Sequence, residues 1–100
     1  MQIIKTIDEI KTIINSNREV LESRFKVKTI GVFGSYVRGA QNKWSDIDIL
    51  VEFSEPVDLI QFIELENYLA GKLGKKVDLV TKNALKPFIG KCILDEVVYV

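Results

Sequence analysis

Residues 34–53 read GSYVRGAQNKWSDIDILVEF, and the rest of the chain is organised around this segment. The run before it, Thr29–Phe33, is β-branched and aromatic, which predicts a strand that leads into the Gly34-Ser35 pair. Gly34 has no Cβ, so the backbone can turn sharply there and come close to a ligand. Ser35 stands where a helix would begin. Its hydroxyl would either cap free backbone N–H groups or bind a phosphate oxygen.

The second half of the segment places two acidic residues on a predicted strand. In residues 46–53, DIDILVEF, alternate side chains point to opposite faces of a sheet. One face is apolar and suits a core: Ile47, Ile49, Val51 and Phe53. Asp46 and Asp48 share the other face, although Asp is a poor strand former and two like charges repel. Either these acids mark a solvated edge strand, or they hold a divalent cation. Oxygen-only ligands in a chain without His favour Mg²⁺, with Mn²⁺ as the alternative.

Two further charged residues are candidates for the same site. Residues 75–81, KKVDLVT, predict a third strand, in which Asp78 points away from the face of Val77 and Leu79. Asp78 either pairs with the preceding lysines or supplies a third carboxylate. Arg38 lies one helical turn after Ser35, and its guanidinium either steadies phosphate charge or pairs with a neighbouring acid.

The remaining patterns predict a compact α+β domain. Helices are expected over about residues 6–15 and 18–25, over the short segment 36–39, from an entry at Ser54–Pro56 to about residue 70, and over much of 84–96 with an interruption at Pro87. Residues 97–100 would form a terminal strand or a packed tail. Trp44 is expected to be a packed loop aromatic, with stacking on a base or contact with a partner as the alternative. Cys92 is expected to be a small buried apolar residue.

Composition places the chain among small globular domains. Its 100 residues, 47% apolar and 28% charged, predict one domain over residues 1–100. Lys plus Arg balances Asp plus Glu at 14 each, which argues against nucleic-acid binding through bulk charge. No apolar run approaches the roughly 20 residues that span a membrane, and no signal peptide is read. With a single cysteine, these features lead us to expect a cytoplasmic protein.

The spacing of the motifs resembles a known family. Gly34-Ser35, ten intervening residues and Asp46-x-Asp48 resemble the signature of the DNA polymerase β-type nucleotidyltransferases. The fuller set of strings, GSYVRG, SDIDILVEF, KKVDLV, ALKPFIG and ILDEVVYV, resembles the minimal nucleotidyltransferases, which are MntA-type antitoxins paired with all-α HEPN-domain toxins. The resemblance covers nearly the whole chain. It implies a polymerase β-like fold, with a small mixed sheet and helices packed on one face.

The resemblance also implies roles for individual residues. Asp46 and Asp48 would hold two Mg²⁺ ions, one that travels with the triphosphate and one that polarises the attacking hydroxyl. Asp78 would help to hold the second ion and assist deprotonation of the acceptor. The triphosphate would be bound by Gly34, Ser35 and Arg38.

The implied reaction is transfer of AMP from ATP to a protein hydroxyl, with a tyrosine of a cognate HEPN toxin as the acceptor. Little chain is left over to form an acceptor pocket, which also points to an acceptor carried by another macromolecule. Two alternatives stay open. The protein would bind nucleotide without catalysis and neutralise the toxin by occlusion, or it would modify a small molecule. The second is disfavoured because such enzymes carry an additional substrate domain.

Overall fold

The described part of the chain, residues 6–85 and 87–100 without the side chains of 87–89, alternates helices with the strands of one sheet in this computed structural model. The helices are α1 (Ile7–Ser16), α2 (Arg18–Ser23), α3 (Ser35–Arg38), α4 (Leu59–Leu73) and α5 (Pro87–Glu96), with a 3₁₀-helix η1 (Lys82–Ala84). The strands are β1 (Val27–Phe33), β2 (Ile47–Phe53), β3 (Val77–Thr81) and β4 (Val98–Tyr99).

The sheet is mixed, with strand order β3-β2-β1-β4. β1 pairs antiparallel with both β2 and β4, whereas β2 and β3 pair in parallel. A parallel pair needs a long crossover, and α4 provides it between β2 and β3. The predicted α+β class with a small mixed sheet is therefore confirmed, and residues 97–100 do supply a terminal strand, β4.

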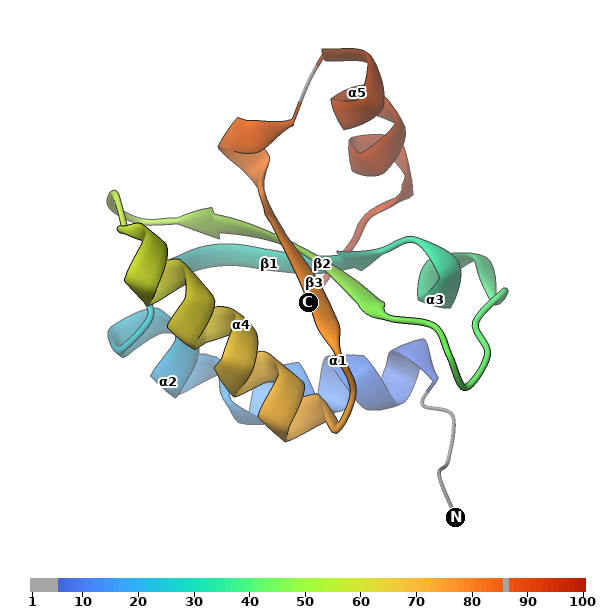
Figure 1. Cartoon of the computed structure of the whole chain (residues 1–100), viewed down its shortest axis with the longest axis horizontal. Helices are drawn as coiled ribbons and strands as arrows, with labels where there is room; N and C mark the ends of the chain where they lie inside the picture. The colour runs from blue at the N-terminus through green and yellow to red at the C-terminus, as the bar shows by residue number, and fades with distance from the viewer. Residues whose placement is uncertain (1–5, 86) are drawn as a thin grey trace.

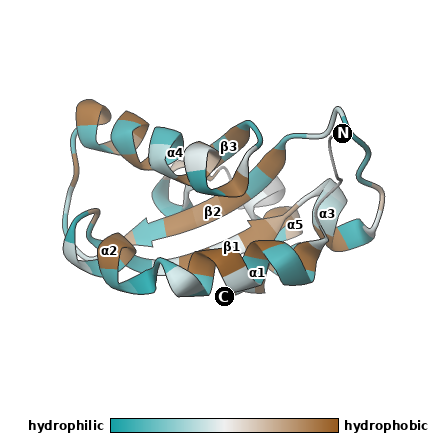
Figure 2. Ribbon diagram, turned by 90° about the horizontal axis from the view of Figure 1, so that it is seen from below, coloured by the Kyte–Doolittle hydropathy of each residue, from teal (hydrophilic) through white to brown (hydrophobic). Residues whose placement is uncertain are grey.

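One face of the sheet carries the core. α1, α2 and α4 lie along this face, while α5 lies on the opposite side (Figures 1 and 2). The apolar side of β2 is buried as its alternation predicted: Ile47, Ile49 and Val51 are fully covered, and Phe53 packs against the same cluster. The helices contribute Ile10, Ile14, Leu21, Leu65, Leu69 and Leu73. Successive side chains of a strand point to opposite faces of the sheet, so the residues that alternate with these core residues point to the other side, where the acids lie.

The start of α4 differs from the expectation. An entry at Ser54–Pro56 was predicted, but the helix begins at Leu59. The reason is a reciprocal cap. The Gln61 N–H donates to Asp58 Oδ1 at 2.8 Å, and the Asp58 N–H donates to Gln61 Oε1 at 2.9 Å.

No helix in the described ranges is both long enough and apolar enough to cross a membrane.

Cys92 is exposed, so its predicted burial is wrong. Its neighbours on α5, Lys91, Leu94 and Asp95, are exposed too. This part of α5 faces solvent, and the apolar residues around Cys92 in the sequence do not enclose its thiol. A local apolar run could not reveal this, because burial depends on whether another element covers the residue.

Tyr36 on α3 offers a test of the core. Its side chain is only 2% exposed, and its hydroxyl has no hydrogen-bond partner among the described residues. An unpaired buried hydroxyl is unfavourable, so we expect Tyr36→Phe to leave the free energy of unfolding unchanged or to raise it by about 1 kcal/mol. Tyr36→Ala, which leaves a cavity, should lower it by about 3–5 kcal/mol. Urea unfolding measures both. A clear loss of stability in Tyr36→Phe would contradict this account of the hydroxyl.

Candidate active site

A glycine turn joins β1 to α3 at the edge of the site. Gly34 has φ 80° and ψ −148°, a backbone conformation that glycine tolerates and other residues do not. A Cβ at this position would overlap the carboxylate of Asp48 on β2. Gly34 therefore does two things: it turns the chain from strand to helix, as predicted, and it leaves room for Asp48 to lie against the turn.

The three predicted acids lie at one end of the sheet. Parallel pairing puts Asp48 directly beside Asp78, while the neighbouring pair, Ile47 and Val77, is buried in the core. Adjacent strands are about 4.8 Å apart, so the two acids share one face at close range. Asp46 immediately precedes β2, and its charge acts on Asp48 as well. The structure thus brings together the carboxylates that the sequence singled out from two separate segments.

The electrostatics of Asp48 favour a cation beside its carboxylate. Its pKa is raised from 3.8 to about 6, first by burial and then by the negative charges of Asp78 and Asp46. Glu96 adds to the rise, and Arg38 opposes it. The local field is therefore negative, and a cation would stabilise the ionised form of Asp48.

The acids fit a hard divalent ion by their chemistry. They offer carboxylate oxygens, which Mg²⁺ and Mn²⁺ prefer, and their mutual repulsion would be relieved by an ion. Within the described residues, no three acidic or cysteine side chains are already gathered at metal-binding positions. Asp46 and Asp78 are both exposed. Exposed side chains change rotamer on a picosecond-to-nanosecond timescale, so these two can turn toward an ion without a backbone change.

The predicted phosphate-binding residues, Gly34, Ser35 and Arg38, lie on or just before the short helix α3. We call the place beside the Gly34 N–H and the Arg38 guanidinium the corner. Gly34 is the N-cap residue, and no side chain in the described chain caps this helix, so the Ser35 hydroxyl does not take the capping role. The Gly34 N–H donates to Glu96 Oε2 at 3.1 Å. Arg38 forms an ion pair with Glu96, which matches its interpretation as the partner of a neighbouring acid. Sequence reasoning missed Glu96, because 58 positions separate it from Arg38 and no local pattern marks it.

Trp44 lies in the loop before Asp46 and is 80% exposed, so the prediction of a packed aromatic is wrong. Side-chain contacts within the loop hold the backbone: Asn42 Oδ1 accepts from the Trp44 N–H at 2.8 Å, and Ser45 Oγ accepts from the Asn42 N–H at 3.0 Å. The ammonium of Lys43 lies 5.0 Å from the centre of the indole ring. These local contacts leave the ring in solvent.

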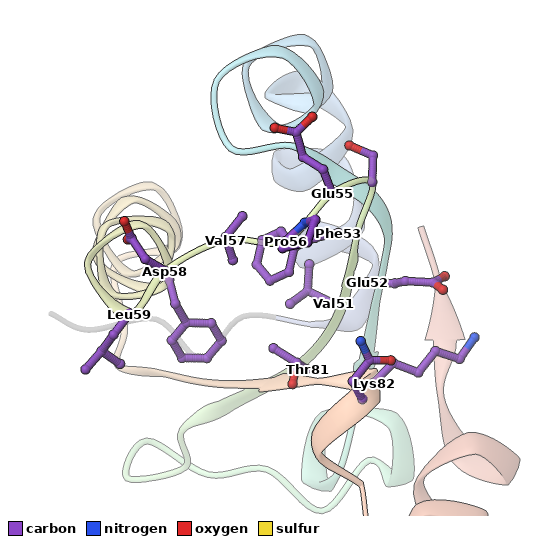
Figure 3. A pocket seen from close by; sticks show the side chains of 13 residues that line it. Val51, Glu52, Phe53, Glu55, Pro56, Val57, Asp58, Leu59, Thr81 and Lys82 are labelled. Atoms are coloured by element: carbon purple, nitrogen blue, oxygen red, sulfur yellow. The ribbon is translucent and has the colours of Figure 1, made fainter.

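A groove of about 600 Å³ lies at the other end of β2 and β3 from the acids (Figure 3). It is lined by the last residues of β2, the loop over residues 54–58, the start of α4, the end of β3 at Thr81 and the start of η1 at Lys82. Asp46, Asp48 and Asp78 do not line it. The groove is therefore separate from the candidate site.

The raised pKa of Asp48 predicts a pH dependence of stability. The folded protein holds this proton more tightly than the unfolded chain, so the stabilising contribution is complete below the unfolded value of 3.8 and is lost as the pH rises through about 6. In metal-free buffer, we expect Asp48→Asn to have a higher Tm than the wild type near neutral pH and a similar Tm near pH 4. Adding Mg²⁺ near neutral pH should raise the Tm of the wild type more than that of the variant. Parallel pH profiles of the two proteins would contradict the prediction.

Comparison with known proteins adds a family match, a similar protein and two similar solved structures. Residues 14–100 match the nucleotidyltransferase domain family. Over 95 residues the chain is 54% identical to protein adenylyltransferase MntA of Thermococcus cleftensis, an alignment that covers 95% of this chain and 96% of that protein.

Among solved structures, the fold is similar to a toxin-antitoxin with AMP-PNP, with 31% identity, a TM-score of 0.72 and coverage of 90% of this chain and 70% of that chain. It is also similar to the complex of tri-AMPylated Shewanella oneidensis HEPN toxin with MNT antitoxin, with 26% identity, a TM-score of 0.66 and the same coverage of both chains. The fold thus recurs in a toxin-antitoxin with AMP-PNP and in a complex that contains an AMPylated toxin.

Proposed function

The chain belongs to the nucleotidyltransferase domain family, among the MntA-type minimal nucleotidyltransferases, and from this we propose that it transfers AMP from ATP to a hydroxyl of a partner protein. One observation carries the proposal beyond the family: Asp48 and Asp78 pair in register on the face beside the Gly34 turn. Two carboxylates and the Gly34 turn then share one end of the sheet. Nucleotidyl transfer needs this combination.

The bond changes of the reaction fit these residues. The acceptor oxygen forms a bond to the α-phosphorus of ATP, the bond from that phosphorus to the bridging α–β oxygen breaks, and pyrophosphate leaves. When bound by the three acids, Mg²⁺ would neutralise charge on the phosphates and polarise the acceptor hydroxyl. Asp78, exposed beside Asp48, is the candidate to take the proton of the acceptor. Arg38 and the Gly34 N–H are the candidates to hold the phosphate oxygens.

The acceptor is proposed to be a tyrosine of a HEPN-domain toxin. The similar complex holds a tri-AMPylated HEPN toxin with its MNT antitoxin. In this chain, the groove of Figure 3 lies at the far end of the sheet from the acids, so it cannot present an acceptor to them. The acids themselves are exposed or half-buried and are accessible to a side chain of a partner. The protein would then act as the antitoxin that silences this partner by modifying it.

Intact-mass spectrometry tests the proposal. The protein is co-expressed with the product of the neighbouring gene, and the purified partner is incubated with the chain, ATP and Mg²⁺. We expect the mass of the partner to rise by one or more adenylyl groups, and to stay constant when EDTA replaces Mg²⁺. Substituting an analogue with a methylene group between the α- and β-phosphates should also prevent the rise. A partner whose mass does not change with ATP and Mg²⁺ would contradict the proposal.

A further inference from the structure

One carboxylate occupies the corner at the start of α3. Glu96 Oε2 accepts a hydrogen bond from the Gly34 N–H at 3.1 Å, and Glu96 Oε1 accepts one from Arg38 Nη1 at 2.5 Å. These are the two donors proposed above for the phosphates of the nucleotide. A carboxylate and a phosphate both present anionic oxygens, so they satisfy such donors in the same way. Glu96 therefore stands where a phosphate oxygen would be expected.

The position of Glu96 is fixed by the backbone around it. Glu96 is the last residue of α5, and the chain continues directly into β4, which pairs with β1. A Cβ on Gly31 of β1 would lie 2.6 Å from Val97 Cγ2 and 3.1 Å from the Val98 carbonyl oxygen, so the two segments pack with no space between them. This close approach brings residue 96 to the end of β1, where Gly34 lies.

The burial of the pair is uneven. The side chain of Glu96 is 22% exposed, whereas that of Arg38 is 59% exposed. An exposed ion pair contributes little stability, so the fold does not depend on the Arg38 contact. Glu96 also adds a negative charge that acts on Asp48.

We propose that Glu96 occupies the phosphate-binding corner while no nucleotide is bound and leaves it when the triphosphate arrives, so that Glu96 sets the affinity for the nucleotide. The inference rests on the proposed function, since it assumes that Gly34 and Arg38 bind phosphate. A rotation about the side-chain bonds of Glu96 is enough to vacate the corner, and α5 and β4 stay in place. Arg38 then exchanges one anionic partner for another.

The proposal predicts that neutralising Glu96 tightens nucleotide binding. When a ligand must displace an internal competitor, its apparent Kd equals the intrinsic Kd divided by the fraction of protein molecules whose site is vacant. A charge-assisted hydrogen bond of ordinary strength corresponds to a change of about tenfold in the dissociation constant. We therefore expect Glu96→Gln, and equally Glu96→Ala, to lower the Kd for the nucleotide by about tenfold.

Isothermal titration of the full chain measures this directly. The probe is the Mg²⁺ complex of the ATP analogue with a methylene group between the α- and β-phosphates, which binds without reacting. Asp95→Asn is the matched control, because Asp95 lies next to Glu96 on α5, is exposed and changes the net charge equally. Its Kd should equal that of the wild type. Thermal unfolding checks that every variant is folded.

The outcomes separate the two proposals. If the wild type binds the analogue and modifies its partner but Glu96→Gln and Glu96→Ala bind no more tightly than Asp95→Asn, the role of Glu96 is overturned and the proposed function stands. If the Glu96 variants bind more weakly than the wild type, Glu96 orients Arg38 for the nucleotide and does not compete with it, which also overturns the inference. If no variant binds the analogue and the wild type transfers no AMP, both proposals fail.

Discussion

Replacing Asp48 by Asn is expected to lower the rate of AMP transfer by about 10³-fold or more. A bound metal ion supplies several kcal/mol of charge stabilisation in the transition state, and each 1.36 kcal/mol is about a factor of ten in rate. Asp48 is the acid that lies against the Gly34 turn and pairs in register with Asp78, so it is the central carboxylate of the site. Asn keeps the volume of the side chain and removes its charge. Single-turnover assays with the partner protein measure the loss.

The stability of the variant makes the result interpretable. Because ionised Asp48 is unfavourable in the metal-free protein, Asp48→Asn should be at least as stable as the wild type near neutral pH. A loss of activity in a protein with an equal or higher Tm cannot be attributed to unfolding. Asp95 is an exposed residue of α5 outside the candidate site, so Asp95→Asn should retain the wild-type rate. A rate for Asp48→Asn within about tenfold of the wild type would contradict a metal-dependent role for this carboxylate.

The same variant decides between catalysis and occlusion. Under the proposed function, Asp48→Asn should fail to neutralise the partner in cells because it cannot modify it. If the variant restores the growth of cells that express the toxic partner as well as the wild type does, physical occlusion is sufficient to neutralise the partner.

Replacing Gly34 by Ala is expected to have the second largest effect. The backbone at φ 80° and ψ −148° excludes an L side chain, which costs on the order of 1–3 kcal/mol of stability. The added Cβ would also overlap the carboxylate of Asp48, so this side chain must move. A displacement of about 1 Å in a catalytic group can lower the rate by about 10²-fold. Urea unfolding and transfer assays on the variant measure the two effects.

Gly39→Ala is the matched control for the Gly34 prediction. Gly39 ends the same helix and also has a positive φ, of 70°, but a Cβ there meets no heavy atom of the described residues within 4 Å. We expect Gly39→Ala to lose about 1–2 kcal/mol of stability from the left-handed backbone and to retain its transfer rate. If both glycine variants lose activity equally, the contact between Gly34 and Asp48 does not matter for the reaction.

Local patterns predicted the parts of the site that depend on strand alternation. The period of two along residues 46–53 separates Asp48 from the apolar side chains, and the same period separates Asp78 from Val77 and Leu79. Glycine chemistry likewise marked the turn at Gly34. What could not be predicted from the residues alone is the register that sets Asp48 beside Asp78. That register depends on where α4 begins and ends, and its start at Leu59 was itself predicted wrongly.

Long-range contacts explain the remaining differences. Glu96 contacts Gly34 and Arg38, which lie 62 and 58 positions earlier in the chain, because β4 pairs with β1. No local periodicity reports a contact of that separation. The exposure of Trp44 and Cys92 has a related cause, since an apolar side chain is buried only where another element covers it.

The most direct test of nucleotidyl transfer follows the phosphorus atoms of ATP. The protein and its partner are incubated with Mg²⁺ and ATP that carries radioactive phosphorus at either the α- or the γ-position, and the partner is then separated from free nucleotide. The account predicts that the partner acquires label from α-labelled ATP and none from γ-labelled ATP, and that Asp48→Asn transfers neither. Label from the γ-position, or no label from the α-position, would contradict it.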